Sequence, residues 1–154
     1  KKMKTSRRLD AAITKIYTAF LNNKLNPDCC KQCAVGNILD KTDSWKHLSD
    51  DHGTLTLNYI GKVHQTLGRK FNGYTPIELL QIERVFLEAC GYQLPLNYKN
   101  KKPENPDNKD ELFKGVQAVI SFLCKLDNVT DIMDYTKLIA FENNDSKYKI
   151  PFIF

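Results

Sequence analysis

Three cysteines lie close together near the start of the chain, at Cys29, Cys30 and Cys33. The pair Cys30 and Cys33 has the C-x-x-C spacing of a zinc knuckle, and thiolates also hold iron–sulfur clusters. Two cysteines supply only part of such a site, so other residues must complete it. We expect Cys29, His52 and Cys90 to support Cys30 and Cys33, with Zn and Fe–S as the two candidate groups.

Two other interpretations of the same cysteines stay open. A C-x-x-C pair at a helix start is typical of thiol redox proteins, because the helix end lowers a thiol pKa. The β-α-β pattern that normally surrounds such a pair is missing here. Cys30 and Cys33 could equally be small buried hydrophobic residues beside Ala34 and Ile38, since free cysteine is among the most buried residue types.

The segment that carries the cysteines is predicted to be a short helix. Asn26 and Pro27 form a turn, and Asp28 is a good N-cap for a helix that begins at Cys29. In such a helix the three thiols lie near its start, close to unpaired backbone N–H groups. The helix dipole and the nearby Lys31 would then favour thiolates.

Periodic apolar residues predict further helices along the chain. Apolar residues recur three and four positions apart in five other segments, at about 6–22, 55–67, 76–90, 109–126 and 130–139. The clearest local signal is Thr75-Pro76-Ile77-Glu78, in which Thr75 and Glu78 form a capping box and Pro76 takes the first helical position. No set of alternating strands is found. We therefore predict an all-α single domain of five to six helices.

The predicted helical domain covers residues 4–140, and residues 141–154 form a C-terminal tail. A long connection at 92–108 contains three prolines and is expected to be exposed. The tail ends in the apolar residues 150–154. An exposed apolar end of this kind is a liability, so we expect it to contact a protein partner or its own core.

Composition limits the classes to which the protein can belong. A chain of 154 residues fits one domain, and its odd count of five cysteines favours free or metal-bound thiols in a reducing compartment. No apolar run approaches the roughly 18 residues of a membrane span, and the basic N-terminus is not followed by the apolar region of a secretory signal. We therefore expect a cytoplasmic protein. Neither of the common glycine-rich phosphate-binding motifs occurs.

Basic segments make nucleic acid an alternative partner. The formal net charge is +5, and the segments at 1–8, 69–70 and 99–102 are rich in Lys and Arg. Tyr74, Tyr92 and Tyr98 are near them in sequence, where they could stack on bases. The 18 acidic residues are spread through the chain, however, so an ordinary solvated surface explains the same pattern. The alternative function is a metal-free module that binds protein or nucleic acid.

An enzyme is the third interpretation, as a thiol redox protein or a reductase component. His47 and His52 flank Asp50 and Asp51, and either histidine could pair with one of these carboxylates for acid–base chemistry. No nucleophile with a recognised context accompanies them. The first interpretation is therefore a metal-binding accessory or interaction protein rather than an enzyme.

The chain also resembles a family of small proteins from flavobacteria and their relatives. The residues that carry the resemblance are LNPDCCKQCAVGNIL at 25–39, DSWKH at 43–47, RKFNGYTP at 69–76 and MDYTK at 133–137. The match covers about residues 4–140, and members of the family often carry the label of the flavoprotein component of the sodium-translocating NADH:quinone reductase. That component resembles a membrane-anchored flavoprotein with a plant-type ferredoxin domain, whose C-x₄-C-x₂-C run is not present here. The resemblance therefore implies family membership and carries no catalytic residue into this sequence.

Overall fold

The computed structural model describes residues 7–94, 100, 102–105 and 108–128. Within these residues the chain forms five α-helices, one short 3₁₀ helix and no strand, which confirms the predicted all-α class. The predicted helix at 130–139, the tail at 141–154 and parts of the proline-rich connection lie outside the described residues. The elements in order are α1 (Arg7–Leu21), α2 (Ala34–Ile38), η1 (Lys46–Leu48), α3 (Tyr59–Thr66), α4 (Pro76–Ala89) and α5 (Lys109–Leu126).

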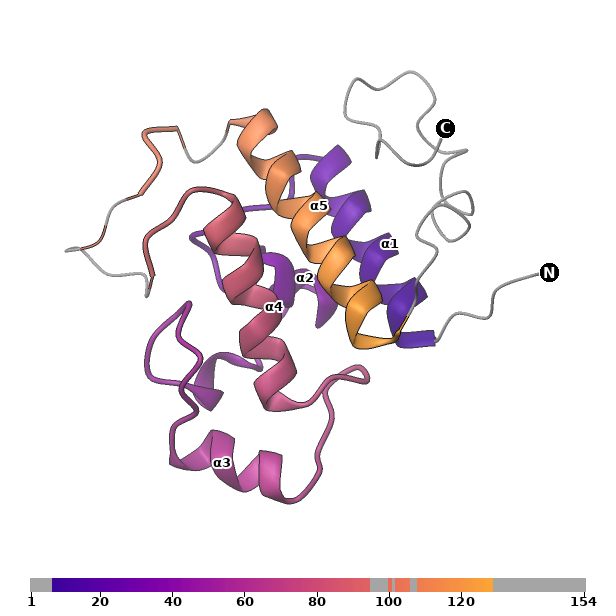
Figure 1. Cartoon of the computed structure of the whole chain (residues 1–154), viewed down its shortest axis with the longest axis vertical. Helices are drawn as coiled ribbons and strands as arrows, with labels where there is room; N and C mark the ends of the chain where they lie inside the picture. The colour runs from indigo at the N-terminus through magenta and orange to yellow at the C-terminus, as the bar shows by residue number, and fades with distance from the viewer. Residues whose placement is uncertain (1–6, 95–99, 101, 106–107, 129–154) are drawn as a thin grey trace.

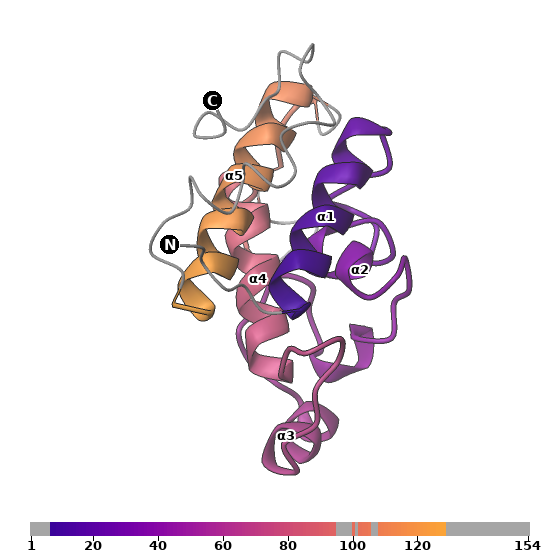
Figure 2. The same ribbon diagram turned by 90° about the vertical axis from the view of Figure 1, so that its right-hand side faces the viewer.

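The three long helices pack together and carry the core. α5 contacts both α1 and α4, and the short α2 packs against α1 and α4 (Figures 1 and 2). α3 lies at one end of the molecule, where it packs against η1 and α4. The largest fully buried side chains include Trp45, Tyr74, Phe20 and Phe86. Because Trp45 and Tyr74 lie in loops, their burial fixes the segments before α3 and α4 against the helical core.

Local signals for α4 and α5 are confirmed. Thr75 accepts a hydrogen bond from the N–H of Glu78, whose side chain accepts one from the N–H of Thr75, so the capping box is complete. α5 spans the expected residues and begins after Asn108, whose side chain accepts from the N–H of Glu111. Gly91 follows α4 with a φ of 96°, the left-handed conformation that ends many helices.

The prediction of a helix beginning at Cys29 is wrong. The cysteines lie in a turn in which the Cys29 carbonyl accepts from the N–H groups of Gln32 and Cys33. α2 begins only after Cys33, which is its N-cap. The loop is closed by a hydrogen bond from the N–H of Asn26 to the Gln32 carbonyl, at 2.8 Å. The cysteine turn is thus folded back on α2, so tertiary contacts override the capping signal at Asp28.

Candidate metal centre

Cys33, His52 and Glu83 come together from three separate parts of the chain. Cys33 is the N-cap of α2, His52 lies in the loop between η1 and α3, and Glu83 lies in the middle of α4. One potential ligand atom from each residue lies within 4.8 Å of those from the other two. Cys33 and Glu83 are fully buried. Sulfur, imidazole nitrogen and carboxylate oxygen are the donors that proteins use for Zn²⁺.

The buried carboxylate of Glu83 is held by two hydrogen bonds. His52 Nε2 donates to Oε2 at 2.6 Å, and the N–H of Val35 donates to Oε1 at 3.2 Å. A carboxylate without such partners would be very costly to bury. The Glu83 side chain therefore joins the loop before α3, the first turn of α2 and the centre of α4.

Glu83 was not among the residues selected from the sequence, although a signal was present. It lies four residues after Leu79 and four before Leu87, and both leucines are fully buried. Positions four apart share one face of a helix. A carboxylate on the buried face of α4 was therefore predictable, although its partners were not.

The thiol of Cys33 is set in a fixed environment. Its Sγ accepts a hydrogen bond from the N–H of Gly36 at 3.3 Å and contacts the carbonyl of Cys30 at 3.6 Å. Burial raises the pKa of this thiol well above its usual value, and the negative charge of Glu83 raises it further. In the metal-free protein these effects disfavour the expected thiolate at Cys33. α2 has only five residues, and its capping hydrogen bond is outweighed by desolvation.

Cys30 contacts the other side of the same imidazole. Its Sγ lies 3.9 Å from His52 Nδ1, whereas Glu83 is bound at Nε2. Trp45 supports both residues, since its Nε1 donates to the Cys30 carbonyl at 3.0 Å and its ring meets His52 edge-on, with centroids 5.3 Å apart. Cys30 and His52 border a hollow of about 120 Å³. The two ring nitrogens of His52 thus face different partners. Unless the ring rotates, an ion bound to His52 can be coordinated by Cys30 or by Glu83, but not by both.

The remaining expected ligands lie outside this group of three. Cys29 is partly exposed, and its backbone belongs to the cysteine turn. Cys90 is buried where α4 meets α5, and a methyl group at Gly115 would lie 2.5 Å from its Sγ. Burial raises the pKa of Cys90 to about 12. Cys90 is packed in the core, and a ligand role for Cys29, Cys30 or Cys90 stays a prediction.

Cys30, His52 and Glu83 also contact one another in this order, as the residues of a catalytic triad do. In such a triad Cys30 would be the nucleophile, His52 the base and Glu83 the group that orients the base. A nucleophilic cysteine needs a lowered thiol pKa. Burial instead raises the pKa of Cys30, although the positive charge of Lys46 opposes the shift. The expected pairing of His52 with Asp50 or Asp51 is not observed, because its hydrogen-bond partner is Glu83. The charges at this site thus favour cation binding over thiol nucleophilicity.

Gly36 holds the cysteine turn against α2. A methyl group there would overlap the carbonyl oxygen of Cys30 and lie 2.5 Å from the carbonyl carbon of Lys31. We expect Gly36→Ala to lower the free energy of unfolding by about 1–3 kcal/mol, since backbone atoms must move to relieve the overlap. The displaced turn should also make Cys33 react faster with a thiol reagent. Urea denaturation and thiol-labelling rates test both effects, and unchanged values would contradict this role of Gly36.

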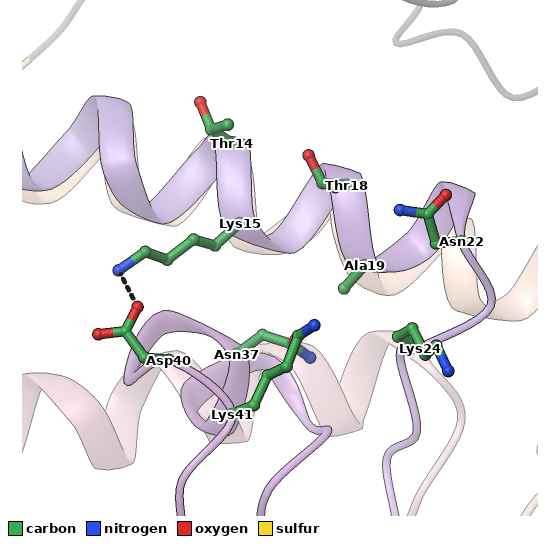
Figure 3. A pocket seen from close by; sticks show the side chains of 9 residues that line it. All are labelled: Thr14, Lys15, Thr18, Ala19, Asn22, Lys24, Asn37, Asp40 and Lys41. Atoms are coloured by element: carbon green, nitrogen blue, oxygen red, sulfur yellow. Dashed lines mark ion pairs between the residues drawn. The ribbon is translucent and has the colours of Figure 1, made fainter.

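A larger cavity, of about 380 Å³, lies between α1 and the turn after α2. Figure 3 shows Lys15 reaching across to Asp40, with which it forms an ion pair of 2.7 Å. No cysteine or histidine is among its lining residues, which are Thr14, Lys15, Thr18, Ala19, Asn22, Lys24, Asn37, Asp40 and Lys41. Side-chain chemistry, rather than cavity size, therefore identifies the candidate site.

The residues expected to contact nucleic acid are engaged elsewhere or buried. Arg8 lies 4.5 Å from the Tyr74 ring centroid and forms ion pairs with Glu78 and Asp127. Tyr74 and Tyr92 are buried, so neither can stack on a base. Arg69 and Lys70 are exposed, whereas residues 1–6, 98–99 and 101 lie outside the described part. The described residues therefore do not bring the basic segments and aromatic rings into one stacking surface.

Comparisons with protein-family models, with curated proteins and with solved structures each find no match. In the described part of the chain, no helix combines the length and apolar character needed to cross a membrane. A functional proposal must therefore come from the chemistry of Cys33, His52 and Glu83.

Proposed function

We propose that the protein binds one Zn²⁺ ion through Cys33 Sγ, His52 Nε2 and a carboxylate oxygen of Glu83. The observation that carries this proposal is the approach of these three donors to within 4.8 Å in a buried site. They come from three segments of the chain, so an ion there would join α2, the loop before α3 and α4. The fourth coordination position is left for a water molecule.

The spacing of the donors fits zinc after small movements. Zn–S and Zn–N bonds of about 2.3 and 2.0 Å at a tetrahedral angle place the two ligand atoms about 3.5 Å apart. The 2.6 Å between His52 Nε2 and Glu83 Oε2 is a hydrogen bond, and the ion would replace its hydrogen. The ring hydrogen would then be at Nδ1, where Cys30 Sγ can accept it. Cys30 thus orients His52, as hydrogen-bonding neighbours commonly do for metal-bound histidines.

The donor set supports zinc rather than an iron–sulfur cluster. Protein-bound iron–sulfur clusters are held mainly by cysteine thiolates. Only one of the three grouped donors is a thiol. A divalent cation would also offset the burial and the Glu83 charge that disfavour ionisation of the Cys33 thiol. Its positive charge lowers the pKa of a coordinated thiol. Zinc would therefore displace the proton that burial retains on Cys33.

The proposed role is that of a metal-binding accessory protein in a reducing compartment such as the cytoplasm. Reducing conditions keep Cys29, Cys30 and Cys33 from forming disulfides and leave their thiols available. The ion would stabilise the short α2 and the cysteine turn, because metal binding adds its free energy to that of folding. The ordered α2 and cysteine turn could then form a surface that binds a protein partner.

The metal-free protein should lose stability as the pH rises above about 9. An unfolded thiol ionises near 9.0, whereas burial keeps Cys33 and Cys90 protonated in the folded state. The folded state then binds more protons, so the free energy of unfolding falls by about 1.4 kcal/mol per pH unit for each such thiol. Below pH 9 this contribution is fully present. Urea denaturation at neutral and alkaline pH tests the slope, which should be shallower in Cys33→Ser.

Zinc affinity, measured by competition with a chromophoric chelator under reducing conditions, tests the proposal. We expect one zinc per chain in the native protein and in the control Cys29→Ser, which removes a neighbouring thiol outside the group. Cys30→Ser should weaken binding by about 10- to 100-fold, the usual effect of losing a neighbour that orients a metal ligand. If Cys30→Ser abolishes binding while Glu83→Gln leaves it unchanged, the ion lies on the Nδ1 side of His52 and the proposed ligand set is wrong.

A further inference from the structure

α3 turns its apolar side chains towards solvent. Tyr59 is 81% exposed, Leu67 61%, Ile60 47% and Val63 39%, and these four residues together form what we call the α3 face. Apolar helix residues normally face the core. A continuous apolar surface on a single short helix marks a site of interaction with another molecule.

The side of α3 that packs on the protein explains this orientation. Gly61 is the buried residue of α3, and a methyl group there would overlap the carbonyl oxygen of Leu48. The helix is therefore attached through its backbone at a glycine, while Asn58 caps its start by accepting from the N–H of Gly61 at 2.8 Å. Close backbone contact fixes the helix with the α3 face outward. The exposure is a consequence of this packing.

The sequence around α3 is rich in positive charge, although the exposed Asp50 lies beside the start of the helix, where it accepts a hydrogen bond from Asn58 at 3.3 Å. Residues 54–77 contain no Asp or Glu, and Lys62, Arg69 and Lys70 give this stretch a formal charge of +3. All three cations are exposed. The other 20 lysines and arginines of the chain are accompanied by all 18 acidic residues, so residues 54–77 carry three of the five net positive charges. The surface therefore complements an anionic partner.

We propose that the α3 face binds the surface of an anionic lipid bilayer. α3 lies at one end of the molecule in both views (Figures 1 and 2), so its side chains can approach a flat surface together. Aliphatic residues would enter the boundary between headgroups and acyl chains, as in other interfacial helices. Tyr59 has the amphipathic ring that favours this depth, and the surrounding cations would attract acidic headgroups. This proposal is independent of the zinc site.

Co-sedimentation of the full chain with lipid vesicles tests the proposal. Vesicles of phosphatidylcholine with one-third phosphatidylglycerol should bind the protein, and vesicles of phosphatidylcholine alone should bind it much less. Leu67→Glu should lower the partition coefficient about tenfold or more, because an inserted aliphatic side chain is replaced by a charge. Lys70→Glu should lower it about fivefold or more, and added salt should weaken binding of the native chain.

Lys24→Glu is the matched control, since Lys24 is an exposed lysine in the loop after α1, outside residues 54–77. It should leave vesicle binding close to that of the native chain. An equal loss in Lys24→Glu and Lys70→Glu would show general charge attraction and overturn the proposal. So would a lack of binding to anionic vesicles. A concentration-dependent dimer that Leu67→Glu dissociates, without vesicle binding, would assign the α3 face to a second copy of the chain instead.

Discussion

Glu83→Ala is expected to lower the free energy of unfolding of the metal-free protein by about 2–6 kcal/mol, since each of two donors left without its acceptor costs about 1–3 kcal/mol. The substitution removes the acceptor for His52 Nε2 and for the N–H of Val35. Both donors would then be left in a site that water reaches poorly. Urea denaturation in the presence of a chelator measures this change without any contribution from bound metal.

Two variants show whether that loss comes from the buried carboxylate. Glu88→Ala changes an exposed glutamate of the same helix, whose side chain is 53% exposed, and should alter stability by less than about 0.5 kcal/mol. Glu83→Gln keeps an oxygen that can accept from Val35 and should cost less than Glu83→Ala. If Glu83→Ala and Glu88→Ala have equal effects, the carboxylate does not hold the three segments together.

Cys33→Ser is expected to weaken zinc binding by more than about 100-fold, exceeding the loss typical of a neighbour that only orients a ligand. Serine keeps the size of the side chain but replaces the thiolate, which zinc prefers, by a hydroxyl that stays protonated. Cys124→Ser is the control, because Cys124 is also a buried cysteine but lies on α5. Chelator competition should separate the two variants clearly. Equal affinities would exclude Cys33 as a ligand.

Much of the helical fold could be predicted because its signals are local. The capping box at Thr75 and Glu78 uses residues three apart, and the apolar stripe of α5 repeats along the whole helix. The cysteine turn was not predictable in the same way. Its shape depends on the close approach of Gly36 to the Cys30 carbonyl and on Asn37, whose Nδ2 donates to the carbonyls of Gln32 and Cys33. Local propensity favoured a helix there, and these packing contacts produced a turn.

The candidate site was only partly accessible from sequence. Residue type and spacing identified Cys33 and His52 as candidate donors, but Glu83 joins them through the packing of α4 against α2. Spacing shows which side chains share a turn or a helix face, and it does not show which distant helices meet. For the same reason, spacing did not show that Arg8 of the basic N-terminal segment forms an ion pair with Asp127, 119 positions away.

The most direct test of the zinc proposal is the absorption spectrum of the reduced protein loaded with Co²⁺ in place of zinc. Coordination by one thiolate, one imidazole and one carboxylate predicts visible bands of tetrahedral intensity and a thiolate-to-cobalt charge-transfer band in the near ultraviolet. One equivalent of Co²⁺ should saturate these bands, and one equivalent of Zn²⁺ should abolish them. The charge-transfer band should be lost in Cys33→Ser and kept in Cys124→Ser. A spectrum indistinguishable from that of Co²⁺ in buffer would contradict metal binding at Cys33, His52 and Glu83.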